Sequence, residues 1–249
     1  MSAPDGGRTG HNASDAPPAR SGPGTSSTAE LTFEVPGSGR VSALLDGASG
    51  AKLGYVLAHG AGAGMRHPFL EALAQRLAVR GVATLRYQFP YMEAKRGRPD
   101  SPAVAVAAVR AAVAEAARQL AGLPLVAGGK SFGGRMTSTA ASQAPLPGVR
   151  GLAFLGFPLH PPGKPSITRA EHLDGVTVPM LFLQGTRDEF ADAALLGQVL
   201  GRLGERAVLH SVEGGDHSFA VPKASRGGRG KDAVLDELAD ALSSWAAAL

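Results

Sequence analysis

The segment Gly129-Lys130-Ser131-Phe132-Gly133 decides the fold that we expect for this chain of 249 residues. It matches the pattern G-x-S-x-G, in which a serine stands on a sharp turn between a strand and a helix. Small residues are needed two positions before and two positions after the serine, because the turn is too tight for a Cβ atom there. Residues 124–127 are typical of a buried strand, and residues 135–143 can continue as a helix. The segment therefore predicts a strand, a strained turn that exposes the Ser131 hydroxyl, and a helix.

Short apolar runs alternate with longer helical patterns on both sides of this segment. Such alternation predicts an α/β fold with a mostly parallel sheet wrapped by helices. The first two runs flank the turn Pro36-Gly37-Ser38-Gly39, so we expect them to pair antiparallel. Helices are expected from about residue 68, after the N-cap Ser101, and over 135–143, 192–203 and 231–249. The eight expected strands cover residues 31–35, 41–45, 53–58, 82–87, 125–127, 151–155, 180–183 and 207–210.

A glycine-rich turn, His59-Gly60-Ala61-Gly62-Ala63-Gly64, follows the third expected strand. Backbone N–H groups of such a turn can point at negative charge on a reacting carbonyl oxygen, together with the N–H of the residue after a nucleophilic serine. Ala61 and Phe132 are the two candidate donors. A dinucleotide loop is disfavoured, since Met65 and His67 stand where the third glycine of G-x-G-x-x-G would fall. A triphosphate loop is disfavoured because Pro124 replaces the first glycine of G-x-x-x-x-G-K-[ST].

Two further loops carry a candidate acid and a candidate base. In Gln184-Gly185-Thr186-Arg187-Asp188-Glu189 the shorter side chain of Asp188 makes it the better acid, and Glu189 is the alternative. In Gly214-Gly215-Asp216-His217-Ser218-Phe219 the base is His217, and Asp216 is interpreted as a turn residue. The order serine, aspartate, histidine along the chain is that of a Ser-Asp-His triad on an α/β sheet.

Several basic residues near these motifs leave the chemistry of the substrate open. Lys130, Arg135, Arg187 and His160 are candidate substrate-binding residues for an anionic group such as a carboxylate. Alternatively, the two arginines pair with carboxylates such as Glu189 or Glu213 and fix the loops. The connection over residues 156–179 is too short for a large helical cap, so we expect an open pocket for small or medium acyl groups. Residues 91–100 are a candidate small flap.

Composition excludes several other classes of protein. The chain has no cysteine, which removes disulfide frameworks, thiolate nucleophiles and cysteine metal sites. The net charge is +4, but the basic runs at 95–98 and 223–231 lack interleaved aromatic residues, so a nucleic-acid partner is not expected. Arg110 and Glu115 interrupt the most apolar stretch, which argues against a membrane span.

The beginning of the chain differs in composition from the rest. Residues 1–28 are rich in Pro, Gly, Ser and Asp, and they lack the apolar core of a secretory signal. We therefore expect a disordered tail over residues 1–28, followed by one α/β domain over residues 29–249, located in the cytoplasm. The sequence makes no prediction of oligomeric state.

The combined motifs resemble those of the KANL3/Tex30-like α/β-hydrolase family, which is similar to dienelactone hydrolases. The resemblance runs from Leu53 to the C-terminus, and its most specific part is Phe157-Pro158-Leu159-His160-Pro161-Pro162-Gly163-Lys164-Pro165. It implies an eight-stranded sheet with an antiparallel second strand, helices on both faces and a minimal lid. It does not imply a known substrate. The motifs themselves predict hydrolysis of an ester-like bond of a small or medium molecule by Ser131, His217 and Asp188, with no metal or cofactor.

Two alternatives to a hydrolase stay open. Some relatives serve as subunits of chromatin complexes, so the fold can act as a catalytically idle scaffold for a protein partner. An acyltransferase would use the same triad, with a second nucleophile in place of water.

Overall fold

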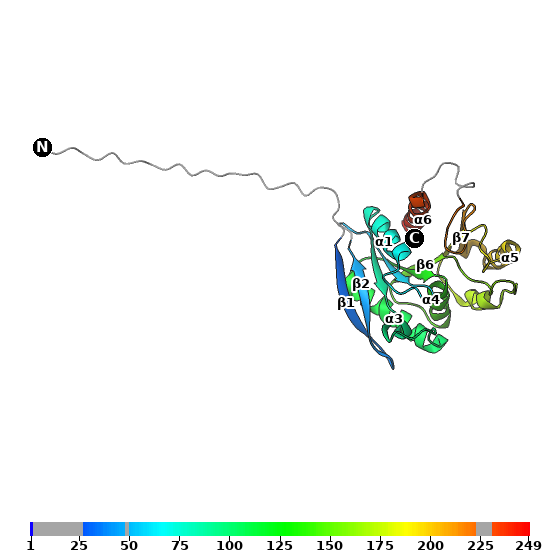
Figure 1. The fold of residues 1–249 in the computed structure, drawn as a ribbon, viewed down its shortest axis with the longest axis horizontal. Coiled ribbons are helices and arrows are strands. Elements are labelled where there is room, and N and C mark those ends of the chain that lie inside the picture. The colour runs from blue at the N-terminus through cyan, green and yellow to red at the C-terminus, as the bar shows by residue number, and fades with distance from the viewer. Residues whose placement is uncertain (2–26, 48–49, 223–230) are drawn as a thin grey trace.

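Eight strands form one sheet in the order β1-β2-β4-β3-β5-β6-β7-β8 (Figure 1). The structure is a computed structural model, and it describes residue 1 and residues 27–47, 50–222 and 231–249. β2 pairs antiparallel with β1 and β4, and the other neighbouring pairs are parallel. The predicted sheet and its antiparallel second strand are therefore confirmed. The strands are β1 (Thr28–Val35), β2 (Gly39–Asp46), β3 (Leu53–Ala58), β4 (Val82–Tyr87), β5 (Leu125–Lys130), β6 (Val149–Leu155), β7 (Met180–Gly185) and β8 (Ala207–Val212).

The first strand begins earlier than its apolar pattern indicates. Thr28 pairs with Asp46 in the β1–β2 register, and its hydroxyl donates to the Asp46 carboxylate at 2.8 Å. The strand thus reaches Thr28, the last residue assigned to the predicted tail, because a polar pair extends the hairpin beyond its apolar residues. Residues 2–26 of that tail and the basic residues at 223–230 lie outside the described residues.

Helices cover both faces of the sheet. α1 (Pro68–Val79) and α6 (Lys231–Ala246) pack together on one face, and α3 (Pro102–Gln119), α4 (Phe132–Gln143) and α5 (Ala193–Leu203) cover the other (Figure 1). These helices confirm the five that were predicted. Ser101 precedes α3 as expected, but its side chain makes no capping hydrogen bond. The short helix α2 (Pro90–Glu93) and the 3₁₀ segments η1 (Thr168–Gly175) and η2 (Gly204–Arg206) were not predicted.

The central strand β3 shows how the sheet is held between these layers. All six of its residues are buried. Val56 and Ala58 contribute to the apolar cluster under α3 and α4, whereas Tyr55 and Leu57 contribute to the cluster under α1 and α6. Since successive side chains of a strand point to opposite faces, a strand that is covered twice is apolar throughout. Burial on both faces fixes the register of the parallel strands and aligns their carboxyl ends along one edge.

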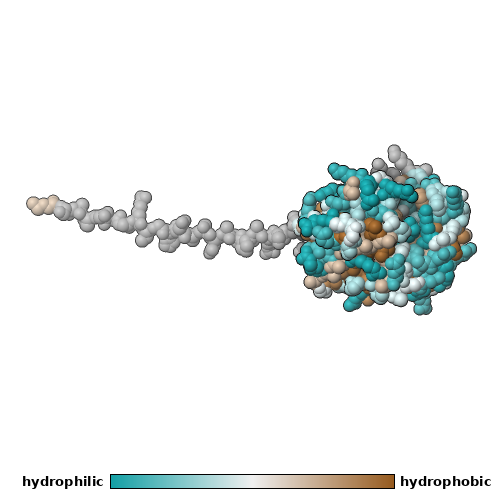
Figure 2. All heavy atoms as spheres, turned by 90° about the horizontal axis from the view of Figure 1, so that it is seen from below, coloured by the Kyte–Doolittle hydropathy of each residue, from teal (hydrophilic) through white to brown (hydrophobic). Residues whose placement is uncertain are grey.

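Within the described residues, η1 is the one helical segment between β6 and β7, so this connection forms no helical cap over the sheet. Among the described residues, no helix is long and apolar enough to cross a membrane. Figure 2 shows one face of the molecule, on which hydrophilic residues surround a smaller apolar area. Such a mixed surface is ordinary for a folded domain.

Candidate active site

Ser131 stands on a strained turn between β5 and α4. Its backbone has φ +49° and ψ −112°, a conformation that L-residues rarely adopt. A Cβ atom at Gly129 would lie 2.3 Å from the carbonyl oxygen of Ala58, and one at Gly133 would lie 2.6 Å from that of His59. The close approach of the third strand and its following loop thus explains the two glycines, and the predicted strand–turn–helix unit is confirmed. Such strain is characteristic of functional serines on α/β sheets.

Three side chains from separate segments form a continuous hydrogen-bonded chain. His217 Nε2 lies 2.9 Å from Ser131 Oγ, and His217 Nδ1 lies 2.7 Å from Asp188 Oδ2. Because the carboxylate can only accept, Nδ1 carries the proton and Nε2 is free to accept from the serine hydroxyl. The structure therefore brings together the three residues that the sequence selected, with the imidazole in the tautomer that a general base needs.

Asp188 is held from several sides. Its side chain is fully buried, and Oδ2 accepts a second hydrogen bond from Gln184 Nε2 at 2.6 Å. Oδ1 accepts from the backbone N–H of Phe190 at 2.8 Å. The alternative acid, Glu189, is exposed. Sequence reasoning gave no role to Gln184. Its place at the end of β7, four residues before Asp188, is the signal that could have marked it as a residue that orients the Asp188 carboxylate.

The loop after β8 places His217, the candidate base. Asp216 accepts from the backbone N–H groups of Ser218 and Ala220, which confirms that it is a turn residue. The ring of His217 packs against Phe190, with 4.2 Å between the centroids. Lys130 Nζ donates to the backbone oxygen of His217 at 2.5 Å. The imidazole is therefore fixed by its own loop, by an aromatic neighbour and by the elbow itself.

The glycine-rich loop after β3 is held by its first residue. The N–H of Phe89 donates to His59 Nε2 at 3.1 Å, so His59 Nδ1 carries the proton and donates to the Gly60 carbonyl at 2.8 Å. Burial lowers the pKa of His59 to about 4, which keeps the ring neutral. The peptide that His59 holds by its oxygen is the one that presents the N–H of Ala61. Among the described residues, the N–H groups of Ala61 and Phe132 have no acceptor.

Side chains from β2, β4 and α2 support the same loop. Arg86 forms a bidentate, buried ion pair with Asp46 and donates to the Met65 carbonyl at 2.9 Å. The N–H of Gly62 donates to the Tyr91 hydroxyl at 2.8 Å. Sequence reasoning missed these supports, because they join residues more than twenty positions apart without a local pattern.

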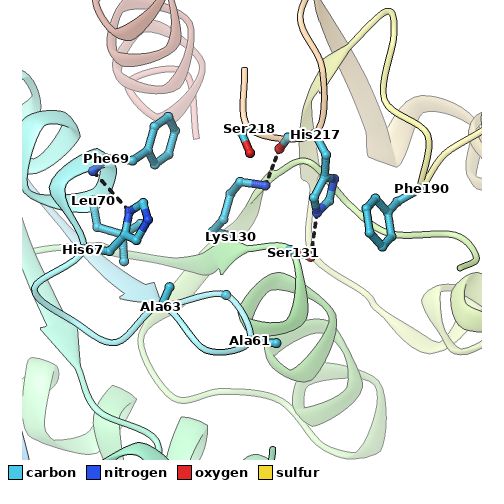
Figure 3. Close-up of a pocket in the computed structure, with 11 residues that line it drawn as sticks. Ala61, Ala63, His67, Phe69, Leu70, Lys130, Ser131, Phe190, His217 and Ser218 are labelled. Carbon is cyan, nitrogen blue, oxygen red and sulfur yellow. Dashed lines mark hydrogen bonds between the residues drawn. The ribbon is translucent and has the colours of Figure 1, made fainter. Parts of the chain in front are cut away.

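A cavity of about 320 Å³ opens beside Ser131 (Figure 3). Its walls are the glycine-rich loop, the start of α1, and the loop that carries the base. Apolar side chains line most of it, and the polar groups come from Lys130, Ser131, His67, His217 and Ser218. The lining includes Ala61, Phe69, Leu70, Lys130 and Phe190.

The structure does not place all the candidate substrate-binding residues at this cavity. Lys130 lines it, but His160 is buried elsewhere, with Nδ1 bonded to the Pro161 carbonyl at 2.9 Å and Nε2 accepting from Asp192 N–H at 3.0 Å. Both ring nitrogens are thus used within the protein, which corrects the expectation that His160 contacts substrate.

The two candidate arginines also lie outside the cavity lining. Arg187 is exposed, and the Arg135 guanidinium carbon lies 6.0 Å from the Phe132 ring centroid. Within the described parts of the chain, neither arginine forms an ion pair with Glu189 or Glu213. The ion pairs that the sequence suggested for them are therefore not formed among the described residues.

The candidate flap over residues 91–100 does not cover the cavity. Tyr91 is buried, and its N–H donates to Asp100 at 2.9 Å, while Arg96 pairs with the same carboxylate at 2.7 Å. These bonds close the segment on itself, and it supplies no residue to the lining.

Comparison with known proteins agrees with this fold. A family model described as "Alpha/beta hydrolase domain" matches residues 51–247. Three solved structures are similar: a dienelactone hydrolase from Anabaena variabilis (19% identity, 88% of this chain and 96% of that chain, TM-score 0.68), a serine hydrolase without lid from Xanthomonas campestris (20%, 87% and 92%, 0.67), and the esterase domain of a Rhodothermus marinus protein (17%, 88% and 98%, 0.66).

Proposed function

Since the chain belongs to the alpha/beta hydrolase domain family, we propose that it is a serine hydrolase that cleaves a carboxylic ester or thioester of a small or medium molecule through an acyl-enzyme. The observation that carries the proposal is the unbroken contact from Ser131 Oγ through His217 to Asp188, at 2.9 Å and 2.7 Å. Hydrolase activity also agrees with the esterase and serine hydrolase names of the similar structures.

In the first half of the proposed reaction, Ser131 Oγ attacks the carbonyl carbon of the substrate while its proton passes to His217 Nε2. The N–H groups of Ala61 and Phe132 donate to the oxygen that becomes negative. Asp188 accepts from Nδ1 and stabilises the imidazolium that forms. The bond to the leaving group breaks as Nε2 returns the proton to it, and the acyl group stays on Ser131.

In the second half, water replaces the leaving group. His217 takes a proton from the water, whose oxygen attacks the acyl carbon, and the proton then returns to Ser131 Oγ as the acid product leaves. These steps use only groups of the chain, the substrate and water, so the proposed reaction needs neither a metal nor an organic cofactor.

The cavity favours a compact substrate. Its volume of about 320 Å³ is at the low end for small-molecule sites, and its walls near Ser131 are mostly apolar. Phe69, Leu70 and Phe190 can contact an aliphatic or aromatic acyl group, whereas a long lipid chain would extend beyond the lining. An anionic substrate remains a second candidate, because the Lys130 ammonium group lines the same cavity.

We further propose that the chain belongs to the KANL3/Tex30-like group within its family and acts in the cytoplasm on a small-molecule ester, with no nucleic-acid partner. A catalytically idle scaffold is disfavoured for two reasons. The N–H groups of Ala61 and Phe132 have no acceptor among the described residues, and His217 is in the tautomer of a general base. A protein-binding surface requires neither feature. An acyltransferase shares the first half-reaction, so the two differ only in the nucleophile of the second half.

The direct experiment measures hydrolysis of a short series of p-nitrophenyl esters of increasing chain length. We expect turnover with short acyl chains, and a loss of several orders of magnitude in Ser131→Ala. Ser244→Ala, an exposed serine on α6 far from the cavity, is the matched control and should keep wild-type rates. A folded wild-type protein that cleaves none of the esters, even with added alcohol or amine acceptors, would contradict the proposal and favour the scaffold.

A further inference from the structure

Lys130 links the two segments that carry the nucleophile and the base. It is the last residue of β5 and directly precedes Ser131. Its side chain extends across the site and donates from Nζ to the backbone oxygen of His217 at 2.5 Å (Figure 3). Nζ also lies 5.5 Å from the centroid of the Phe219 ring. One side chain thus connects the elbow with the loop that follows β8.

The Lys130 ammonium group also lies close to the other two polar groups of the site. A Cβ atom built on Gly156 would lie 3.1 Å from Lys130 Nζ, 3.4 Å from Asp188 Oδ2 and 3.4 Å from His217 Nδ1. Gly156 has φ +67° and leaves this point empty. The cation, the carboxylate and the imidazole therefore converge on one spot, on the side of His217 away from the serine.

Keeping a cation there is unfavourable for folding. Burial lowers the pKa of Lys130 to about 8, against the attraction of the Asp188 and Asp216 carboxylates. Within the described residues, Lys130 forms no ion pair within 4.0 Å that would offset the loss of hydration. A methionine or leucine would fill the same space without that cost, so the charge calls for a reason other than stability.

We propose that Lys130 is a positioning residue of the proposed reaction, whose ammonium group holds the backbone of His217 against the elbow and whose charge opposes protonation of the imidazole before it accepts the proton of Ser131. This inference rests on the proposed function. Three charged groups lie near His217. Lys130 faces it from β5, and Asp188 faces it from the loop after β7. Asp216 lies on the same loop as His217, after β8. His67 also lines the cavity and can titrate.

The same geometry argues against Lys130 as the receptor of an anionic substrate. One donor of the ammonium group is used by the His217 carbonyl, and the Phe219 ring covers another side. A substrate carboxylate would have to displace these contacts and would approach Asp188. Binding of a carboxylate by Lys130 is thus the competing role that the experiment must separate.

The test compares kcat, KM and their pH dependence for the wild type, Lys130→Met, Lys130→Gln and Lys130→Arg, on a neutral ester and on a carboxylate-bearing ester of equal length. The control for loss of one positive charge is Lys52→Met, because Lys52 is exposed and does not line the cavity. For Lys130→Met we expect kcat on the neutral ester to fall by about tenfold or more, with KM changed by less than about threefold.

The pH profile separates the charge from the hydrogen bond. In Lys130→Met and Lys130→Gln the acid limb of kcat/KM should move to higher pH by roughly half a unit or more, because the imidazole loses a neighbouring cation. Lys130→Gln retains a donor for the carbonyl and should keep more of kcat than Lys130→Met. Lys130→Arg retains the charge and should keep the wild-type acid limb. If Lys130→Met does not fold, the shifted limb in Lys130→Gln carries the test.

Three results have different meanings. Wild-type kcat and an unmoved acid limb in Lys130→Met and Lys130→Gln would overturn the inference and leave the proposed function intact. A rise of KM that is confined to the carboxylate-bearing ester would also overturn it and assign Lys130 to substrate binding. A folded wild type without activity on either ester would overturn the proposed function, and the inference with it.

Discussion

His59 Nδ1 donates to the carbonyl oxygen of Gly60 across 2.8 Å and so fixes the peptide whose N–H belongs to Ala61. If that N–H stabilises the reacting oxygen, His59→Ala should lower kcat by about tenfold or more, because loss of a whole donor costs about a hundredfold or more. His59→Asn keeps a donor near the position of Nδ1 and should retain more activity. Equal ester kinetics for the two folded variants would contradict this role.

Gln184 is expected to hold Asp188, the acid of the proposed triad. Its amide donates to Asp188 at 2.6 Å and accepts from Phe157 N–H at 2.9 Å. Gln184→Met removes both bonds and leaves a buried N–H without a partner, so we expect a loss of about 1–3 kcal/mol in the free energy of unfolding. Denaturant titration should show this loss of stability, and ester kinetics should show a fall in kcat of about tenfold. A destabilised variant with wild-type kcat would restrict Gln184 to a structural role.

Gly156 should not tolerate a side chain. Gly156→Ala places a methyl group 3.1–3.4 Å from Lys130 Nζ, Asp188 Oδ2 and His217 Nδ1, so we expect kcat to fall by about tenfold or more. Gly163→Ala is the matched control, since Gly163 has φ +70° but no atom within 4 Å of the added Cβ. Both variants bear a backbone strain of about 1–2 kcal/mol. A similar loss of kcat in both would mean that strain, not crowding of the site, is the cause.

The buried His59 and the half-buried His172 predict that the protein loses stability in acid. Burial lowers the pKa of His59 to about 4, and burial with the nearby Arg135 lowers that of His172 to about 4. Between about pH 6.5 and 4 the unfolded chain therefore binds more protons than the folded one. The contribution is complete above pH 6.5 and is lost as the pH falls, by at most about 1.4 kcal/mol per pH unit for each histidine. Urea titrations at several pH values in this range give the free energy of unfolding of the wild type and of His172→Gln. The slope of that free energy against pH should be smaller in the variant. An unchanged slope would contradict the assignment for His172.

The sequence predicted those features that depend on local patterns. The elbow around Ser131 was identified because backbone crowding demands glycines at fixed spacing, and the crowding at Gly129 and Gly133 confirms that reason. The choice of Asp188 over Glu189 followed from side-chain length, and the buried contact with His217 agrees with it. Alternation of apolar runs was enough to predict the strands, because a sheet covered on both faces demands apolar residues throughout.

Features that depend on distant contacts could not be predicted. Charge alone made His160 and Arg135 candidates for substrate contact, but the folded chain uses both nitrogens of His160 internally and leaves Arg135 outside the cavity. The role of Gly156 follows from the meeting of three loops, and no pattern in the sequence marks it. The segment after Tyr91 resembled a flap in composition, yet a buried carboxylate at Asp100 ties it down.

The most direct test of the central claim is to locate the covalent adduct that a fluorophosphonate forms with the purified protein, by mass spectrometry of its peptides. We predict one adduct, on the oxygen of Ser131, with labelling abolished in Ser131→Ala and strongly slowed in His217→Ala. A folded wild type that takes up no label, or takes it up at another residue, would contradict the claim that Ser131 is an activated nucleophile.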